Sequence, residues 1–448
     1  MYICDPEKIR DGISFKLVQK YLKIHKKELP RLERLEDYYN GVHSILHRGK
    51  DEGQPNNRLV CNHAKYITDM ATGYLVGNPV SYEGDGADSL KEWYKKADAP
   101  TQDMDLSKDA SVYGKAFELV YFSSDQYPIC KLANLNPKNA FLVYDDTVEH
   151  LELFGVYYFP DFDDDGKTIG YKCNVYDNNS IISSLLDRDM NPKGEPEVTP
   201  HHFGRVPMTE YYNNEECQGD FEQVISLIDA YNLLQSDRVN DKEQFVDSIL
   251  LLLNSSLGDD AKEESEALKA LKRERVLELH DNGDARWLTR TFDESSVEIL
   301  RKAIEQDIHK FSNVPCMTDE NFVGNSSGVA MRYKMLGFEQ VTHIKERYFT
   351  EGLKRRIVLF ENAMEKKGVP RFDPSAINIT FTRNLPVNET EIASMVAQLS
   401  GQVPAEILLA QLPFIKDAEA AVHQMAREKA DNLKRQQTAF GYTGLTNE

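Results

Sequence analysis

The most distinctive stretch of the sequence lies late in the chain, at residues 327–367. It contains no proline, and its only glycines are Gly328, Gly337 and Gly352. A continuous helix here would be about 60 Å long at 1.5 Å per residue. Helices in compact globular domains average about 11 residues. The stretch therefore predicts a ring, a bundle or a coiled coil, with Gly337 and Gly352 as candidate bends.

Two regions near the N-terminus also show helical periodicity. From Phe15 to Leu22 apolar residues recur at helical spacing, and basic residues fill the other face. Pro30 is expected to interrupt this region, which resumes at residues 31–39. A further helix is expected at residues 62–74, ending near Gly77.

Two more long helices are expected in the second half of the chain. No glycine or proline occurs between Asp220 and Ser256, and a helix of about 25 residues would extend about 37 Å. Residues 297–311 form a second amphipathic pattern. Between them, residues 259–275 are expected to form a short charged helix, followed by a strand-like stretch at 276–288.

The remaining regions indicate an α+β fold. Residues 80–212 contain β-branched and aromatic runs separated by turn residues, which predict several antiparallel strands. Residues 377–382 alternate like a single strand that must pair with strands far back in the sequence. Asn388 and Glu391 fit a cap for a helix ending at Gly401, and two more helices are expected at residues 405–412 and 417–435.

The charge and the cysteines limit the class of protein. With a net charge of −20, the chain is a poor general binder of phosphate backbones, so any DNA contact must be local or weak. No cysteines form a C-x-x-C pair, which argues against a zinc ribbon or a disulfide scaffold. Neither a secretory signal nor a run long enough to span a bilayer is expected. The six cysteines are Cys4, Cys61, Cys130, Cys173, Cys217 and Cys316.

Several patterns resemble catalytic or binding motifs but lack a required residue. Residues 161–166 (DFDDDG) start like a calcium loop, yet the twelfth position is Lys172, so an acidic hairpin tip is preferred. The first glycine of a P-loop ending in Gly166-Lys167 would fall on Asp161. The pair His201-His202 has no H-E-x-x-H context. We therefore expect no cofactor, no metal and no enzymatic activity.

A helix-turn-helix pattern and a basic cluster are two further candidates for a binding role. Residues 388–412 could form a helix-turn-helix, but the second helix has no basic or amide side chain at its start to read bases. The densest basic cluster is either a solvated helix face or a surface for an acidic partner. Its members are Lys269, Lys272, Arg273 and Arg275.

Three stretches, in order and at matching spacing, resemble the portal proteins of long-tailed phages of Gram-positive hosts. The first comprises YYNGVHSILHR at 38–48 and NNRLVCNHAKYITDMATGYLVGNPVSYEG at 56–84. The second is SLIDAYNLLQSDRVNDKEQFVDSILLL at 226–252. The third is FSNVPCMTDENFVGNSSGVAMRYKMLGFE at 311–339, followed by INITFTRNLPVNETE at 377–391.

The resemblance implies a dodecameric ring with a wing, a stem, a clip and a crown around a central DNA channel. It places the wing at 1–219, stem helices at 220–244 and 295–312, and the clip at 245–294. A tunnel loop at 313–326 precedes a long wing and channel helix at 327–368. A wing strand at 369–387 precedes the crown and tail at 388–448. The tunnel-loop residues at the channel would be Met317, Thr318, Asp319, Glu320, Asn321 and Phe322.

The resemblance also implies a place and partners. The ring would sit at the portal vertex of the virion, after assembly in the host cytoplasm. It would pass double-stranded DNA without sequence preference and contact the terminase large subunit, a head-completion or adaptor protein, and the major capsid and scaffolding proteins. The basic cluster at 269–275 would belong to the clip surface that meets such partners. No membrane contact is expected.

An acidic channel suits that role because a basic lumen would bind a duplex by counterion release and stall it. Two alternatives stay open. One is a different structural component of the capsid or connector, which electron micrographs of twelve-fold rings would distinguish. The other is a metal-dependent nucleic-acid enzyme, which metal-dependent DNA cleavage would reveal.

Overall fold

The computed structural model describes residues 1–49, 55–124, 126–246, 249–253, 265, 284–288, 294–317, 328–383 and 389–409, with scattered residues beyond. The chain divides into two compact units. The first comprises Met1–Met317 and Met335–Asn384, and the second comprises Thr318–Lys334 and Leu385–Glu448. The fold is mixed α+β, as expected from the sequence, and each unit is described by itself below.

A six-stranded sheet forms one side of the first unit, in the order β1-β5-β6-β7-β8-β9. Its strands pair antiparallel except β1 with β5, which are parallel. Helix α1 (Phe15–His25) packs on one face through Val18, Tyr21 and Leu22. The strands are β1 (Tyr2–Ile3), β5 (Ala140–Tyr144), β6 (Glu152–Phe162), β7 (Thr168–Tyr176), β8 (Ser180–Leu186) and β9 (Pro192–Pro200).

A three-stranded sheet packs against the six-stranded sheet. It consists of β10 (Met208–Tyr212), β3 (Lys115–Phe122) and β4 (Cys130–Leu135), in that order. Phe117 of β3, Leu142 of β5 and Met208 of β10 belong to the hydrophobic core cluster that joins the two sheets. The antiparallel strands expected between residues 80 and 212 are therefore confirmed.

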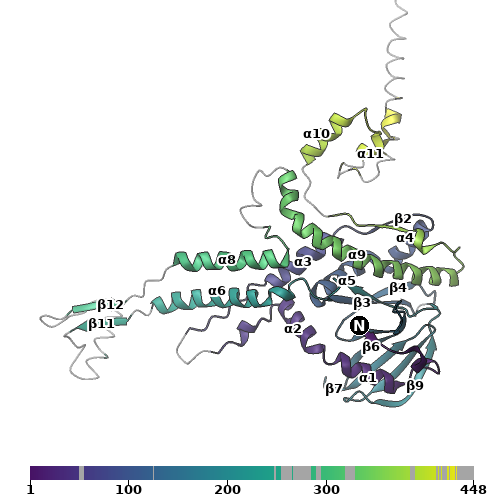
Figure 1. The fold of residues 1–448 in the computed structure, drawn as a ribbon, viewed down its shortest axis with the longest axis horizontal. Coiled ribbons are helices and arrows are strands. Elements are labelled where there is room, and N and C mark those ends of the chain that lie inside the picture. The colour runs from purple at the N-terminus through teal and green to yellow at the C-terminus, as the bar shows by residue number, and fades with distance from the viewer. Residues whose placement is uncertain are drawn as a thin grey trace, which may run out of the picture. The chain divides into compact units, whose positions relative to one another are not determined.

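Helices α4 (Ala87–Ala97) and α5 (Ala99–Tyr113) contact the three-stranded sheet, and α2 (Leu29–Asn40) and α3 (His63–Val76) pack against α5 (Figure 1). The long helix α9 (Gly328–Lys366), which starts in the second unit, packs on the same sheet through Phe349 and Leu353. The sequence analysis missed α4 and α5, because it assigned the region after residue 80 to strands. The interruption expected near Pro30 is confirmed, because α1 ends at His25 and a second helix, α2, starts at Leu29. Pro30 lies in the first turn of α2, where its missing N–H costs no hydrogen bond.

The late strand pairs with an early one, as predicted. β13 (Asn378–Thr380) runs antiparallel to β2 (Ser81–Glu83), with Ile379 opposite Tyr82. Both residues belong to the core cluster beneath α9. This pairing fixes the chain after α9 to a strand about 300 residues earlier.

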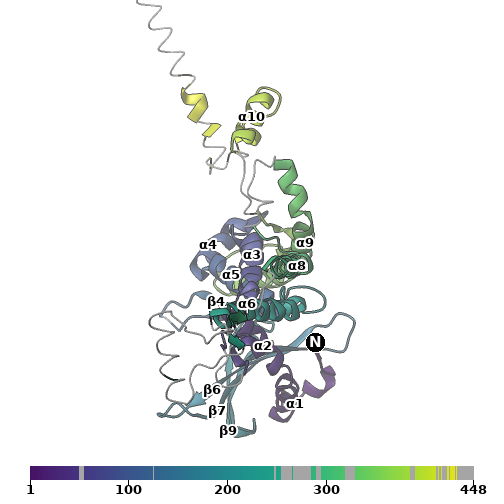
Figure 2. The ribbon, with the colours of Figure 1, turned by 90° about the vertical axis from the view of Figure 1, so that its left-hand side faces the viewer.

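Two antiparallel helices project from the sheets and helices of the first unit. α6 (Ile225–Val246) and α8 (Glu294–Ser312) lie side by side, and Figure 2 looks along them. A short turn of 3₁₀-helix, Glu222–Val224, leads into α6. Beyond their far ends, β11 (Ile249–Leu253) pairs antiparallel with β12 (Asp284–Leu288). The long helices expected on either side of residues 245–294 are thus confirmed.

In the second unit, the described residues include the first turns of α9, α10 (Glu389–Leu399) and α11 (Ala405–Leu409). α10 ends before Gly401, as the sequence predicts, and Gly401 has a φ of 86°, in the left-handed region that glycine tolerates. Residues 421–430 include further helical positions.

Candidate functional site

An extended segment at residues 57–61 is held along α6 by a row of buried polar side chains. The backbone N–H groups of Asn57, Leu59 and Cys61 donate to the side chains of Asn240, Ser236 and Asn232, at 2.7, 2.9 and 2.7 Å. All three acceptors are at most 2% exposed. Two residues of extended chain advance about 6.6 Å and four helical residues about 6 Å, so the two periods match. We call this contact the α6 seam.

Ionic and hydroxyl contacts continue the attachment of α6 to the N-terminal helices. Arg31 of α2 donates two hydrogen bonds to Glu222, at 2.6 and 2.7 Å. Tyr38 of α2 donates to Asp229 at 2.7 Å. Arg48 pairs with Asp237 at 2.7 Å. Because these partners recur along α6, they fix the direction of the helix relative to the sheets.

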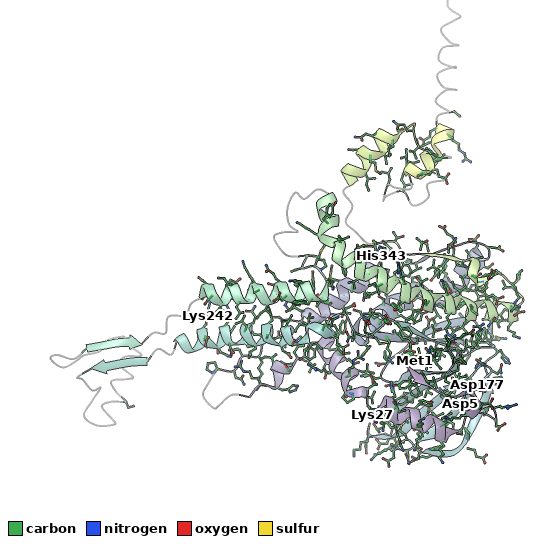
Figure 3. The ribbon with its side chains drawn as sticks, in the orientation of Figure 1. Met1, Asp5, Lys27, Asp177, Lys242 and His343 are labelled. Atoms are coloured by element: carbon green, nitrogen blue, oxygen red, sulfur yellow. The ribbon has the colours of Figure 1, made fainter. Side chains whose placement is uncertain are left out.

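α8 is bound to α6 by charged pairs near its N-terminal end. Arg301 donates to the Tyr231 hydroxyl at 3.1 Å, and Arg238 pairs with Glu298 at 3.1 Å. Lys242, labelled in Figure 3, pairs with Glu294 at 2.9 Å. These contacts occupy the face of α8 that turns toward α6.

The outer faces of the helix pair are partly apolar. Ile299 is 69% exposed and Leu300 is 50% exposed on α8, while Leu233 is 43% exposed on α6. Phe311 is 54% exposed at the other end of α8. Single exposed apolar side chains are ordinary on a protein surface, whereas a contiguous patch of them marks a contact with another chain.

Histidines and a tyrosine gather where α3 meets the C-terminal end of α8. The rings of His63 and His309 lie 5.6 Å apart, and burial lowers the pKa of His63 to about 4, so His63 is neutral near pH 7. The Tyr66 hydroxyl donates to the carbonyl of Pro315 at 3.1 Å and accepts from the N–H of Met317 at 2.9 Å. The chain leaving α8 is therefore attached to α3.

α9 is anchored by charges inside the first unit. Arg356 is fully buried and pairs with Asp103 of α5 at 2.7 Å and with Glu118 of β3 at 2.8 Å. Lys345 pairs with Asp220 at 2.5 Å, next to the start of α6. Gly352, one of the two candidate bends, lets α9 approach Tyr211, since an added Cβ would lie 2.3 Å from that ring. The helix is continuous through both Gly337 and Gly352.

The segment that starts like a calcium loop and the histidine pair have structural roles among the described residues. Residues 161–168 form the β6–β7 hairpin tip, in which Asp163 accepts from the N–H groups of Asp165 and Lys167, at 3.1 and 2.7 Å. His201 is buried and bonds the carbonyl of Asp177 at 2.7 Å. None of the six cysteines takes part in a disulfide. No group of three or more metal-ligating side chains occurs among the described residues.

Of the sequence-predicted site residues, the structure describes one. Met317 lies at the end of the segment bound by Tyr66. The others lie outside the described residues, so their arrangement stays a prediction. They are Thr318, Asp319, Glu320, Asn321 and Phe322 of the tunnel loop and Lys269, Lys272, Arg273 and Arg275 of the clip. None of the described helices is long and apolar enough to cross a bilayer.

The described chain is an α+β protein with two projecting helices that are fixed by polar contacts. The chain belongs to the phage portal proteins, since the family model "Phage portal protein, SPP1 Gp6-like" matches residues 18–435. Portal proteins are structural components of the virion and not enzymes. The resemblance to phage portal proteins is thus confirmed, and the ring, the domain boundaries and the partners that it implies stay predictions.

Two individual relatives are themselves portal proteins. The chain is 25% identical over 423 residues to the portal protein of Clostridium phage phiCD119, covering 88% of this chain and 91% of that one. It is 22% identical over 440 residues to the portal protein of Bacillus phage SPP1, covering 95% and 84%. A chain from the virion of a native gene transfer agent particle matches with a TM-score of 0.43 and 11% identity, over 78% and 89% of the two chains.

The sequence analysis missed the α6 seam. Asn232, Ser236 and Asn240 are four residues apart, which places them on one face of a helix, but such residues usually indicate a solvated face. Their partners at 57–61 are more than 170 residues away. The only available signal was that both stretches fall within the segments that resemble portal proteins.

Proposed function

We propose that this chain is one subunit of a dodecameric ring at a capsid vertex, through which double-stranded DNA enters during packaging and leaves at ejection. Family membership supports the portal role. The observation that carries the ring is the apolar outer face of α6 and α8, formed by Leu233, Ile299 and Leu300. A head-to-tail contact that closes by rotation would bury this face on every subunit.

The proposed domain assignment takes over the boundaries that the resemblance implies. The sheets and helices of residues 1–219, with the strand at 369–387, are the wing, and α6 and α8 are the stem. Residues 245–294 are the clip and residues 388–448 the crown and tail. Residues 313–326 are the tunnel loop, followed by the long helix at 327–368. The attachment of Pro315 and Met317 to Tyr66 supports a fixed starting point for that loop.

The α6 seam suits a stem that has to keep its direction while DNA moves past it. A stem attached only by its ends could pivot, whereas α6 is bonded at Asn232, Ser236 and Asn240 and again at Glu222 and Asp229. Each buried hydrogen bond left without its partner would cost about 1–3 kcal/mol, which opposes such a movement.

The clip would bind the terminase large subunit during packaging and a head-completion or adaptor protein afterwards, with Lys269, Lys272, Arg273 and Arg275 facing acidic surfaces. The wing and crown would contact the major capsid and scaffolding proteins. Family membership supports these roles in general, and the particular residues remain part of the proposal.

Native mass spectrometry and electron microscopy of the purified chain test the ring. We expect a mass of twelve copies and ring-shaped particles. In the double variant Ile299→Glu/Leu300→Glu, charges would be buried at the subunit contact, so rings should be lost while the subunit keeps its circular dichroism spectrum. Met104→Glu, on an α5 residue that is 46% exposed, is the matched control and should still form rings.

Two results would overturn the proposal. One is a wild-type chain that stays monomeric at every concentration and salt tested. The other is a double variant that assembles into rings as well as the control does, because the stem face would then not be the subunit contact.

A further inference from the structure

The outer face of α1 carries a row of lysines. Lys16, Lys20, Lys23 and Lys27 follow one another at intervals of four, three and four residues, and all four are exposed. This spacing places them within a narrow stripe on one helical face. The first three are on α1, and Lys27 lies in the turn directly after it, where it is labelled in Figure 3. The row is about 16 Å long at 1.5 Å per residue.

The row is not neutralised within the chain. None of the described carboxylates lies within ion-pair distance of these four lysines, although the chain has 73 acidic and 53 basic residues. Lys20 lies 5.4 Å from the centre of the Tyr21 ring. α1 itself contains no acidic residue. Like charges at these spacings destabilise a helix, so the row has a cost that folding alone does not explain.

The opposite face of α1 holds the row in place. Val18, Tyr21 and Leu22 are at most 3% exposed and pack on the six-stranded sheet. The Tyr21 hydroxyl donates to the carbonyl of Ile3 at 2.6 Å, and Gln19 donates to Asn191 of the β8–β9 turn at 2.6 Å. The lysines therefore project from a helix that is fixed to the sheet.

We propose that this row binds the phosphate backbone of double-stranded DNA without reading its sequence. One DNA strand carries a phosphate about every 3.4 Å along the axis, so several phosphates fall within the length of the row. A lysine ammonium group acts as a point charge and does not require a partner of fixed geometry. A row of lysines therefore fits the evenly spaced phosphates of DNA better than a particular arrangement of carboxylates on a protein. Ile24, 37% exposed, is the only exposed large apolar residue of α1, so no apolar groove for an acidic peptide is evident there.

The binding itself requires neither a ring nor a channel. Its biological meaning rests on the proposed function, since a ring would repeat the row around its circumference and could hold packaged DNA at the wing. Such a site would be confined to α1. It would differ from the proposed acidic channel, where binding of DNA would oppose the movement of the DNA.

Fluorescence anisotropy of the full-length chain with a short DNA duplex, from about 50 to 200 mM salt, tests the inference. The variant Lys16→Gln/Lys23→Gln removes two charges without touching the core of α1. Each phosphate contact contributes about −0.9 to the slope of log affinity against log salt. We expect the slope to become shallower by about 1.8 and the affinity to fall by about tenfold or more.

The variant Lys95→Gln/Lys96→Gln changes the same charge on two exposed residues of α4 and should leave the slope unchanged. An unchanged slope in the α1 variant would overturn the proposal, as would equal effects of the two variants. Equal binding of polyglutamate at the same concentration of charge would also overturn it, in favour of an acidic protein partner. Native mass spectrometry of the same samples reports ring formation separately.

Discussion

At the scale of single residues, Arg356 has the most demanding environment in the described chain. Its side chain is 0% exposed, and the carboxyl groups of Asp103 and Glu118 that pair with it are 4% and 0% exposed. Burial raises the pKa of both carboxyl groups, and Arg356 acts in the opposite direction. Glu118 also accepts from the Tyr211 hydroxyl at 2.9 Å. The cluster joins α9, α5 and two strands.

Replacing Arg356 with Met should therefore destabilise the chain by about 3–5 kcal/mol at pH 7, because two buried carboxylates would lose their cation. Urea unfolding measures the loss. Protonation of a carboxyl group whose pKa is raised by folding favours the folded state, so the variant should regain stability as the pH falls below 7. Arg371→Met, at a pair that is 64% exposed on the arginine side, should cost less than about 1 kcal/mol.

At the scale of elements, the two glycines inside α9 have different surroundings. An added Cβ at Gly352 would lie 2.3 Å from two carbon atoms of the Tyr211 ring, which is fully buried. At Gly337 the nearest atom, Oδ1 of Asn313, would be 3.9 Å away. Alanine is the better helix former by about 1 kcal/mol where space allows it.

Gly352→Ala should thus lower the free energy of unfolding, because Tyr211 and its bond to Glu118 would have to shift. We expect a loss of about 1–3 kcal/mol, typical of overpacking in a core. Gly337→Ala should instead be neutral or stabilising by up to about 1 kcal/mol. Thermal or urea unfolding of the two variants compares them directly. A larger loss at Gly337 than at Gly352 would contradict the packing described here.

The elements also show which features the sequence could predict. The expected helices at 62–74 and 297–311 and the long helix after residue 327 were found because they combine periodicity with an absence of breakers. α4 and α5 were missed because the β-branched and aromatic runs that begin at residue 115 were taken to represent the whole region from residue 80. The seam on α6 could not be predicted, since its polar residues acquire partners only through tertiary contact.

At the scale of the whole molecule, the net charge of the chain and the positions of its charged residues affect a DNA duplex in different ways. A chain with a net charge of −20 repels a duplex in general, and a lysine row on α1 is compatible with that only because it is local. In the proposed ring, the tunnel-loop residues Asp319 and Glu320 would come closest to the DNA. Their effect on translocation should then depend on where they are and not on the total charge.

Asp319→Lys/Glu320→Lys tests this dependence, because ammonium groups at the channel would bind phosphates and slow the DNA. We expect rings of unchanged subunit number and a reduced rate and final length of packaged DNA. Asp164→Lys/Asp165→Lys at the β6–β7 tip makes the same change in net charge on exposed residues, and there packaging should be unaffected. Equal slowing by both variants would attribute the effect to net charge, and normal packaging by the tunnel-loop variant would contradict an acidic collar around the DNA.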